Sequence, residues 1–104
     1  MSWDVWLEID DEEIADCGNM TWNVAPMYYE ALESERGIGG LDGMTGEEAS
    51  KYLVGAISKM VNDPDKYKAM NPKNGWGCYG GALEFLITIR NYCDNNSKAI
   101  VRVS

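Results

Sequence analysis

The 104-residue chain contains no histidine, only three cysteines, three prolines and one phenylalanine. Without histidine it has no Ser-His-Asp triad, no Cys-His dyad and no zinc site of the HExxH type. Cys17, Cys78 and Cys93 form no CxxC pair, and an odd number of thiols argues against a disulfide framework. The composition therefore predicts a non-enzymatic protein with reduced thiols, no metal and no cofactor.

Long apolar runs are also missing. No stretch approaches the ~20 residues of a membrane span, and Met1-Ser2-Trp3-Asp4 lacks the basic and apolar regions of a signal peptide. We therefore expect a cytoplasmic protein that does not enter a membrane. Apolar residues make up 45% of the chain, with four tryptophans and six tyrosines, which suffices for one domain over residues 1–104.

Basic residues are scarce in the first half of the chain. Residues 1–50 hold 13 acidic side chains and one basic side chain, Arg36, whereas residues 51–104 hold four acidic and eight basic ones. An acidic half repels nucleic acid and anionic membranes and attracts basic surfaces. Solubility alone is the other explanation of the charge of −8. Direct binding to nucleic acid is disfavoured.

The ends of the chain have the period of two that is typical of strands. Residues 3–9 alternate apolar and polar side chains, as do residues 99–103. Residues 10–18 are expected to form an acidic turn or loop, and residues 20–24 a second short strand or an extended lead-in. Pro26 suits the first turn of a helix, with Asn23 as its cap.

Two longer helices are expected in the second half. Thr45 and Glu48 form a capping box at the start of the first. Its apolar stripe consists of Ala49, Tyr52, Leu53, Ala56, Ile57, Met60 and Val61. The second runs over about 79–94, with the stripe Ala82, Leu83, Leu86, Ile89, Tyr92 and Cys93, widened by Phe85. Between them, Asp63-Pro64 predicts a short helix, and residues 37–44 and 71–81 are glycine-rich loops.

These elements predict an α+β domain: a small antiparallel sheet, with the N- and C-terminal strands paired, covered on one face by three to four helices. Gly75-Trp76-Gly77-Cys78-Tyr79-Gly80 matches GxGxxG, but no strand precedes it, so a dinucleotide fold is disfavoured. A turn whose glycines let Trp76 and Tyr79 pack on the helices explains the motif. A helix entry that holds an anion beside Lys73 is the alternative.

Two sets of residues are candidates for binding. The first is a polar and aromatic set that can stack on and hydrogen-bond a flat ligand or a partner: Asn19, Thr21, Trp22, Asn23, Tyr28, Lys73, Asn74, Trp76 and Tyr79. Capping and core packing are the competing roles, and the sequence leaves open whether segments 19–29 and 71–81 meet. The second set is an acidic partner face: Asp10, Asp11, Glu12, Glu13 and Asp16. Its spacing is not that of an EF-hand.

Residues 19–27 (NMTWNVAPM) and 71–86 (NPKNGWGCYGGALEFL), with Gly43-Met44-Thr45-Gly46, resemble small uncharacterised proteins of bacteriophages and bacterial mobile elements. No activity of that group can be carried over to a residue. The position of Cys78 is often acidic in such sequences, which weakens a metal or acid role there. The resemblance implies a small accessory protein in the cytoplasm of a bacterial host.

Two functions follow as expectations. The first is antagonism of host defence by binding a host protein, with the acidic half occupying the basic groove of a nucleic-acid-binding effector. The second is a sponge for a nucleotide immune signal, whose phosphates Lys51, Lys66, Lys68 and Lys73 would bind. A homo-oligomer is possible in that case, because two short chains build a deeper pocket than one.

Overall fold

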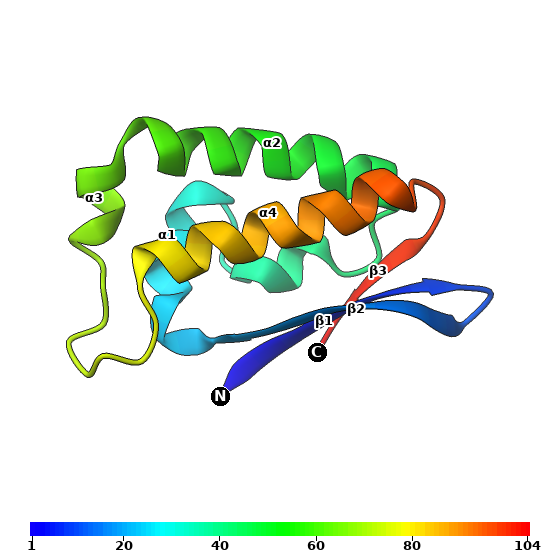
Figure 1. Cartoon of the computed structure of the whole chain (residues 1–104), viewed down its shortest axis with the longest axis horizontal. Helices are drawn as coiled ribbons and strands as arrows, with labels where there is room; N and C mark the ends of the chain where they lie inside the picture. Colours follow the sequence, from blue (N-terminus) through cyan, green and yellow to red (C-terminus); the bar gives the residue numbers. More distant parts are fainter.

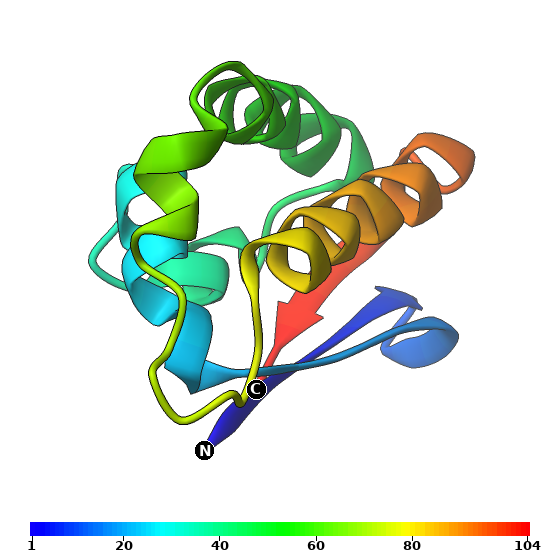
Figure 2. The ribbon, with the colours of Figure 1, turned by 60° about the vertical axis from the view of Figure 1, so that its left-hand side comes forward.

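The sheet lies on one side of the molecule and every helix on the other (Figures 1 and 2). The computed structural model describes all 104 residues. The elements in chain order are β1 (Ser2–Ile9), β2 (Glu12–Thr21), the 3-10 helix η1 (Trp22–Val24), α1 (Ala25–Ala31), the 3-10 helix η2 (Gly37–Leu41), α2 (Gly46–Asn62), α3 (Pro64–Lys68), α4 (Tyr79–Asn95) and β3 (Ile100–Val103). The predicted α+β class, with one antiparallel sheet and four α-helices, is confirmed.

β1 is the central strand, and the sheet order is β2-β1-β3. Val5 pairs with Val103 and Leu7 with Val101, so the predicted pairing of the N- and C-terminal strands is confirmed. Asp4 and Ser104 exchange two backbone hydrogen bonds of 2.9 Å beyond the end of this ladder. The alternation seen in the sequence buries one face of β1 beneath the helices.

The predicted loop over residues 10–18 is wrong. Asp10 and Asp11 alone make the turn, with φ of 51° and 64°, as a tight two-residue hairpin requires. β2 then pairs with β1 along its length, with register irregularities opposite Val5/Trp6 and Leu7/Glu8. These bulges interrupt the period of two, so an apolar alternation cannot be read from the sequence of β2.

The entry to the helical layer also differs in detail. Thr21, not Asn23, supplies the cap: its hydroxyl accepts from the backbone N–H of Asn23 at 3.2 Å and begins η1. Val24 precedes α1 without a side-chain cap, and proline stands in the first turn of α1 as predicted. Residues 37–41, expected to be loop, form η2.

The long helices agree with their sequence signals. The Thr45–Glu48 capping box is present at the start of α2, and α4 starts at residue 79 as predicted. Asp63 stands at the start of α3 without a side-chain capping bond. Three members of the expected stripes, Tyr52, Val61 and Tyr92, are exposed to solvent. The hydroxyl of Tyr52 hydrogen-bonds to the carbonyl of Leu32.

The start of α2 touches the segment that leads into β3. The N–H of Gly46 donates to the carbonyl of Ala99 at 2.8 Å. A Cβ at Gly46 would lie 2.3 Å from the carbonyl oxygen of Asn96, so no larger residue fits without a backbone shift. This contact fixes α2 relative to the third strand of the sheet.

Candidate functional surfaces

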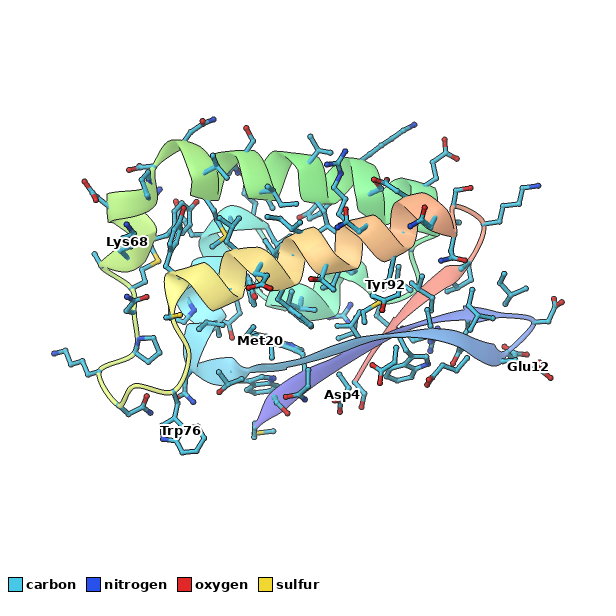
Figure 3. The ribbon with its side chains drawn as sticks, in the orientation of Figure 1. Asp4, Glu12, Met20, Lys68, Trp76 and Tyr92 are labelled. Carbon is cyan, nitrogen blue, oxygen red and sulfur yellow. The ribbon has the colours of Figure 1, made fainter.

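Carboxylates gather on the side of the sheet that no helix covers. Asp4 and Glu8 lie on the outer side of β1, and the register places Glu13 beside Glu8 and Asp16 beside Trp6. Figure 3 shows Asp4 below the sheet and Glu12 near the tip of the hairpin. Together with the carboxylates at the tip of the hairpin, they make up a set that we call the acidic face: Asp4, Glu8, Asp10, Asp11, Glu12, Glu13 and Asp16. It contains the five acidic residues singled out in the sequence.

The acidic face has few compensating cations: Lys98 and Arg102 line a hollow together with Glu8, Asp10 and Asp11. Only Glu8 has a cation within 4 Å, the Arg102 Nε at 4.0 Å. Asp4 accepts from the side-chain amide of Asn19 at 2.8 Å, and Asp16 from the backbone N–H of Gly18 at 2.9 Å. These bonds orient two carboxylates without neutralising them. The surface therefore carries a concentrated negative potential that attracts basic groups.

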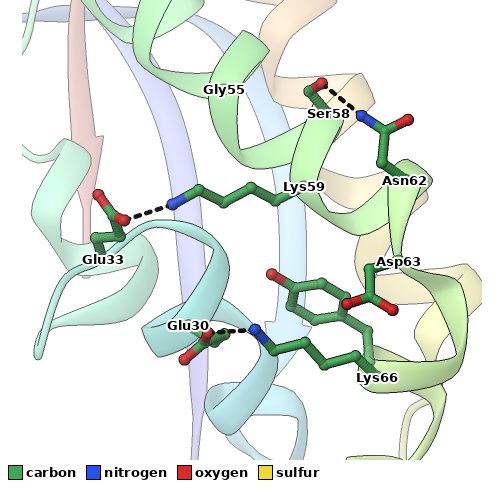
Figure 4. Close-up of a pocket in the computed structure, with 9 residues that line it drawn as sticks. Glu30, Glu33, Gly55, Ser58, Lys59, Asn62, Asp63 and Lys66 are labelled. Atoms are coloured by element: carbon green, nitrogen blue, oxygen red, sulfur yellow. Dashed lines mark hydrogen bonds and ion pairs between the residues drawn. The ribbon is translucent and has the colours of Figure 1, made fainter.

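A groove on the helical side differs from the acidic face because its charged side chains are paired. It encloses about 560 Å³ between α1, α2 and α3, with Tyr67 among its lining residues (Figure 4). Lys59 pairs with Glu33 at 2.7 Å, and Lys66 with Glu30 at 2.5 Å. The hydrogen bond from Lys66 lowers the pKa of Glu30, and the same bond raises the pKa of Lys66. These charges already satisfy one another, so the groove offers no free cation for a phosphate.

The two segments that the sequence left unconnected do meet. The side-chain amide of Asn74 donates to the side-chain oxygen of Asn23 at 3.2 Å. A Cβ at Gly77 would lie 2.7 Å from Cγ1 of Val24, so a glycine is needed where the loop crosses η1. We call the junction formed by Thr21, Trp22, Asn23, Asn74, Trp76 and Gly77 the tryptophan corner.

Trp76 projects into solvent from this corner. The residue is 70% exposed, so the prediction that Trp76 packs on the helices is wrong. Figure 3 shows it at the end of the molecule away from Glu12. Its backbone N–H donates to the side-chain oxygen of Asn74 at 2.9 Å, which stabilises the turn. Trp22 is 41% exposed and packs against Trp3 with ring centroids 5.6 Å apart.

Other candidates have structural roles or lie elsewhere. Tyr28 is fully buried, its hydroxyl donates to the carbonyl of Ala82 at 2.8 Å, and burial raises its pKa. It belongs to the core and cannot contact a ligand. Tyr79 is half-buried and donates to the carbonyl of Met60 at 2.6 Å. Asn19 lies beside Asp4 on the sheet, whereas Lys73 is exposed on the loop next to the tryptophan corner.

The tryptophan corner is an open platform. None of the five depressions on the surface is lined by Trp22 or Trp76. A flat group could stack on Trp76 there, but no walls enclose it. The sequence identified Trp22 and Trp76 as candidates. It could not predict how far they are exposed, because their exposure depends on how the loop crosses η1.

The thiols and the glycine motif show no catalytic arrangement. Burial raises the pKa of Cys17 to about 12 and that of Cys93 to about 11, which suppresses their thiolates at neutral pH. Cys78 is exposed, and its sulfur accepts from the N–H of Gly81 at 3.4 Å at the start of α4. No strand precedes Gly75, and Gly75 and Gly77 have positive φ, so the motif forms a turn.

No group of three or more acidic or cysteine side chains is placed to hold a metal ion. None of the helices is long and apolar enough to cross a membrane. Comparison with family models, curated proteins and solved structures finds no match for this chain. Its function is therefore argued from its surfaces.

Proposed function

We propose that this chain is a non-enzymatic binding protein that uses its acidic face to occupy a basic surface of another protein. The observation that carries the proposal is that the acidic face holds seven carboxylates, of which one has a cation within 4 Å. A basic surface that normally holds nucleic acid is complementary to such an array, because it is built to neutralise repeated negative charges.

The geometry of a strand supports this choice of partner. Alternate residues of a strand lie about 7 Å apart on one side, and neighbouring strands about 5 Å apart. Asp4 and Glu8 on β1 therefore lie about 14 Å apart, and the register places Asp16 of β2 beside Trp6 between them and Glu13 beside Glu8, so the four carboxylates form two neighbouring rows. Given the resemblance to bacteriophage proteins, the proposed partner is a nucleic-acid-binding defence protein of a bacterial host, and binding would antagonise it.

The test is competition with DNA. Immobilised protein is exposed to a bacterial lysate at low salt, and retained proteins are challenged with a DNA fragment. We expect DNA and rising salt to release a nucleic-acid-binding protein, since screening weakens charge-driven association. Retention should be lost in the variant Asp11→Asn/Glu12→Gln/Glu13→Gln.

The matched control removes the same number of charges from the helical side, as Glu35→Gln/Glu47→Gln/Glu84→Gln. This control should retain the partner. Equal loss in both triple variants would mean that net charge, rather than the acidic face, drives the association. A retained protein that DNA does not displace would contradict the proposal.

A second function is favoured by the hydrogen bond between Asn23 and Asn74, which brings the two candidate segments together. The tryptophan corner, with Trp76 exposed and Lys73 beside it, could bind a nucleotide by stacking on its base and pairing with its phosphate. Titration with linear and cyclic nucleotides should then quench tryptophan fluorescence in the wild type. The same titration should have no effect in Trp76→Leu.

A further inference from the structure

An apolar strip lies exposed between α2 and α4. Val54 is 45% exposed, Val61 52% and Ile87 39%, while Ile57 and Leu83 are partly buried. We call these five residues the helical seam. The deeply buried residues of α2 (Ala49, Leu53, Ala56 and Met60) lie on a different side of the helix. The seam residues are therefore additional to the core and are left without a partner.

The helical spacing and two cross-helix bonds place the five residues together. Val54, Ile57 and Val61 stand at i, i+3 and i+7 on α2, and Leu83 and Ile87 at i and i+4 on α4. Ser50 hydrogen-bonds to Asp94 at one end, and Tyr79 donates to the carbonyl of Met60 at the other. The helices are thus antiparallel, and the two apolar rows flank the same seam.

The charges beside the seam are few and of both signs. Arg90 pairs with Asp94 at 3.7 Å, and the exposed Lys51 and Glu84 stand three residues before Val54 and Ile87. A partner must therefore be apolar at its centre and carry charges of both signs at its edges. A second copy of the chain has this pattern.

We infer that two copies of this chain associate through the helical seam, with α2 of one copy packed antiparallel on α4 of the other. This inference is independent of the proposed function. A twofold axis parallel to the helices produces this arrangement and brings Val54 of one copy level with Ile87 of the other. The four helices then alternate in direction, as in an antiparallel bundle.

Charge selects this axis over the alternative. The sheet lies beyond α4 as seen from α2 (Figures 1 and 2). An axis parallel to the helices carries the two sheets, with their acidic faces, to opposite sides of the pair. A perpendicular axis would place both sheets on the same side, where their charges would repel. The chosen axis also brings Lys51 of one copy to the end of α4 that carries Asp94 of the other.

The oligomeric state of the purified protein tests the inference. Sedimentation velocity over a wide concentration range should show a species approaching twice the mass of one chain. Val54→Asp and Ile87→Asp each put a charge in the seam and should raise the dimer Kd at least about tenfold. Circular dichroism checks that each variant is folded, and Val61→Lys provides a second position if one variant is not.

Matched controls distinguish the seam from other exposed apolar side chains. Ile14→Asp on β2 and Trp76→Ala at the tryptophan corner should leave the dimer intact. A single-chain mass at every concentration would overturn the inference. So would a dimer that survives the seam variants and is lost in either control.

Cross-linking tests the orientation. In a Cys78→Ser background, chains carrying Val54→Cys are mixed with chains carrying Ile87→Cys and oxidised with glutathione disulfide. We expect a disulfide between the two kinds of chain. Disulfides that form only between identical chains would contradict the axis parallel to the helices.

Discussion

The sheet side and the helical side of this molecule differ in how many of their carboxylates are paired with a cation. On the helical side, lysine or arginine pairs with a carboxylate in four places: Lys51–Glu47, Lys59–Glu33, Lys66–Glu30 and Arg90–Asp94. On the acidic face, six of seven carboxylates have no cation within 4 Å. Since exposed ion pairs contribute little to stability, the difference concerns what each side can bind more than how each side folds.

The largest expected effect on stability comes from a substitution in the core between the sheet and the helices. Leu86 is fully buried on α4 between the helices and the sheet. Leu86→Ala should lower the free energy of unfolding by about 2–5 kcal/mol, because it removes buried methyl groups and leaves a cavity. Its neighbour Ile87 is on the exposed seam, so Ile87→Ala should cost much less. Urea denaturation measures both, and equal losses would contradict the assigned core.

The second-largest expected effect on stability comes from removing a buried hydroxyl group. Tyr28 on α1 donates to the carbonyl of Ala82 at the start of α4. Tyr28→Phe should lower the free energy of unfolding by about 1–1.5 kcal/mol, since a buried hydrogen bond is lost while the Ala82 carbonyl keeps its partner within α4. Tyr29→Phe, at an exposed neighbour, is the control and should melt like the wild type.

The capping box of α2 should contribute somewhat less. Thr45→Ala removes the acceptor for the N–H of Glu48 and should cost about 1 kcal/mol. Thr45→Ser keeps a hydroxyl and should recover most of that loss. Chemical denaturation of the three proteins measures it, and an Ala variant as stable as the wild type would mean that the cap is not needed.

The smallest expected effect is on the pH dependence of stability, and it tests whether the paired carboxylates of the helical side behave differently from unpaired ones. The hydrogen bond from Lys66 lowers the pKa of Glu30 in the folded state. Its contribution to stability is therefore present above the unfolded glutamate pKa of about 4.3 and is lost as the pH falls through the lower folded value. The melting temperature of Glu30→Gln should fall less steeply with acid than that of the wild type. Glu35→Gln removes a carboxylate without an ion pair and should follow the wild type.

Local signals predicted much of the fold. The capping box, the prolines and the apolar spacing located α1, α2 and α4, and the alternation at both ends predicted β1 and β3. β2 was missed because its outer side is polar, its inner side is short of large apolar residues, and its bulges shift the alternation. Two bulges and several carboxylates on this edge strand also discourage pairing with another chain.

The candidate sites were predictable in part. Acidic residues were recognised from the sequence, but a loop was expected where a strand arranges them in rows. Tyr28, a binding candidate with core packing as its competing role, is buried in the core, whereas Trp76, expected to pack on the helices, is exposed. Neither helical periodicity around Tyr28 nor the turn residues around Trp76 show which aromatic side chain the rest of the fold covers. The helical seam could not be predicted for the same reason: the sequence does not show which apolar side chains the fold leaves uncovered, and Val61 was expected in the core stripe.

The pairing of β1 with β3 has a consequence for how the chain folds. Asp4 and Ser104 are hydrogen-bonded neighbours, although 99 residues separate them in the sequence. The hairpin of β1 and β2 closes locally and forms within about 1–10 µs, yet two strands alone are marginally stable in water. Closing the large loop between β1 and β3 costs entropy that only the packed helices can offset. The central strand therefore acquires its second neighbour late, and folding should be slower than the helical content suggests.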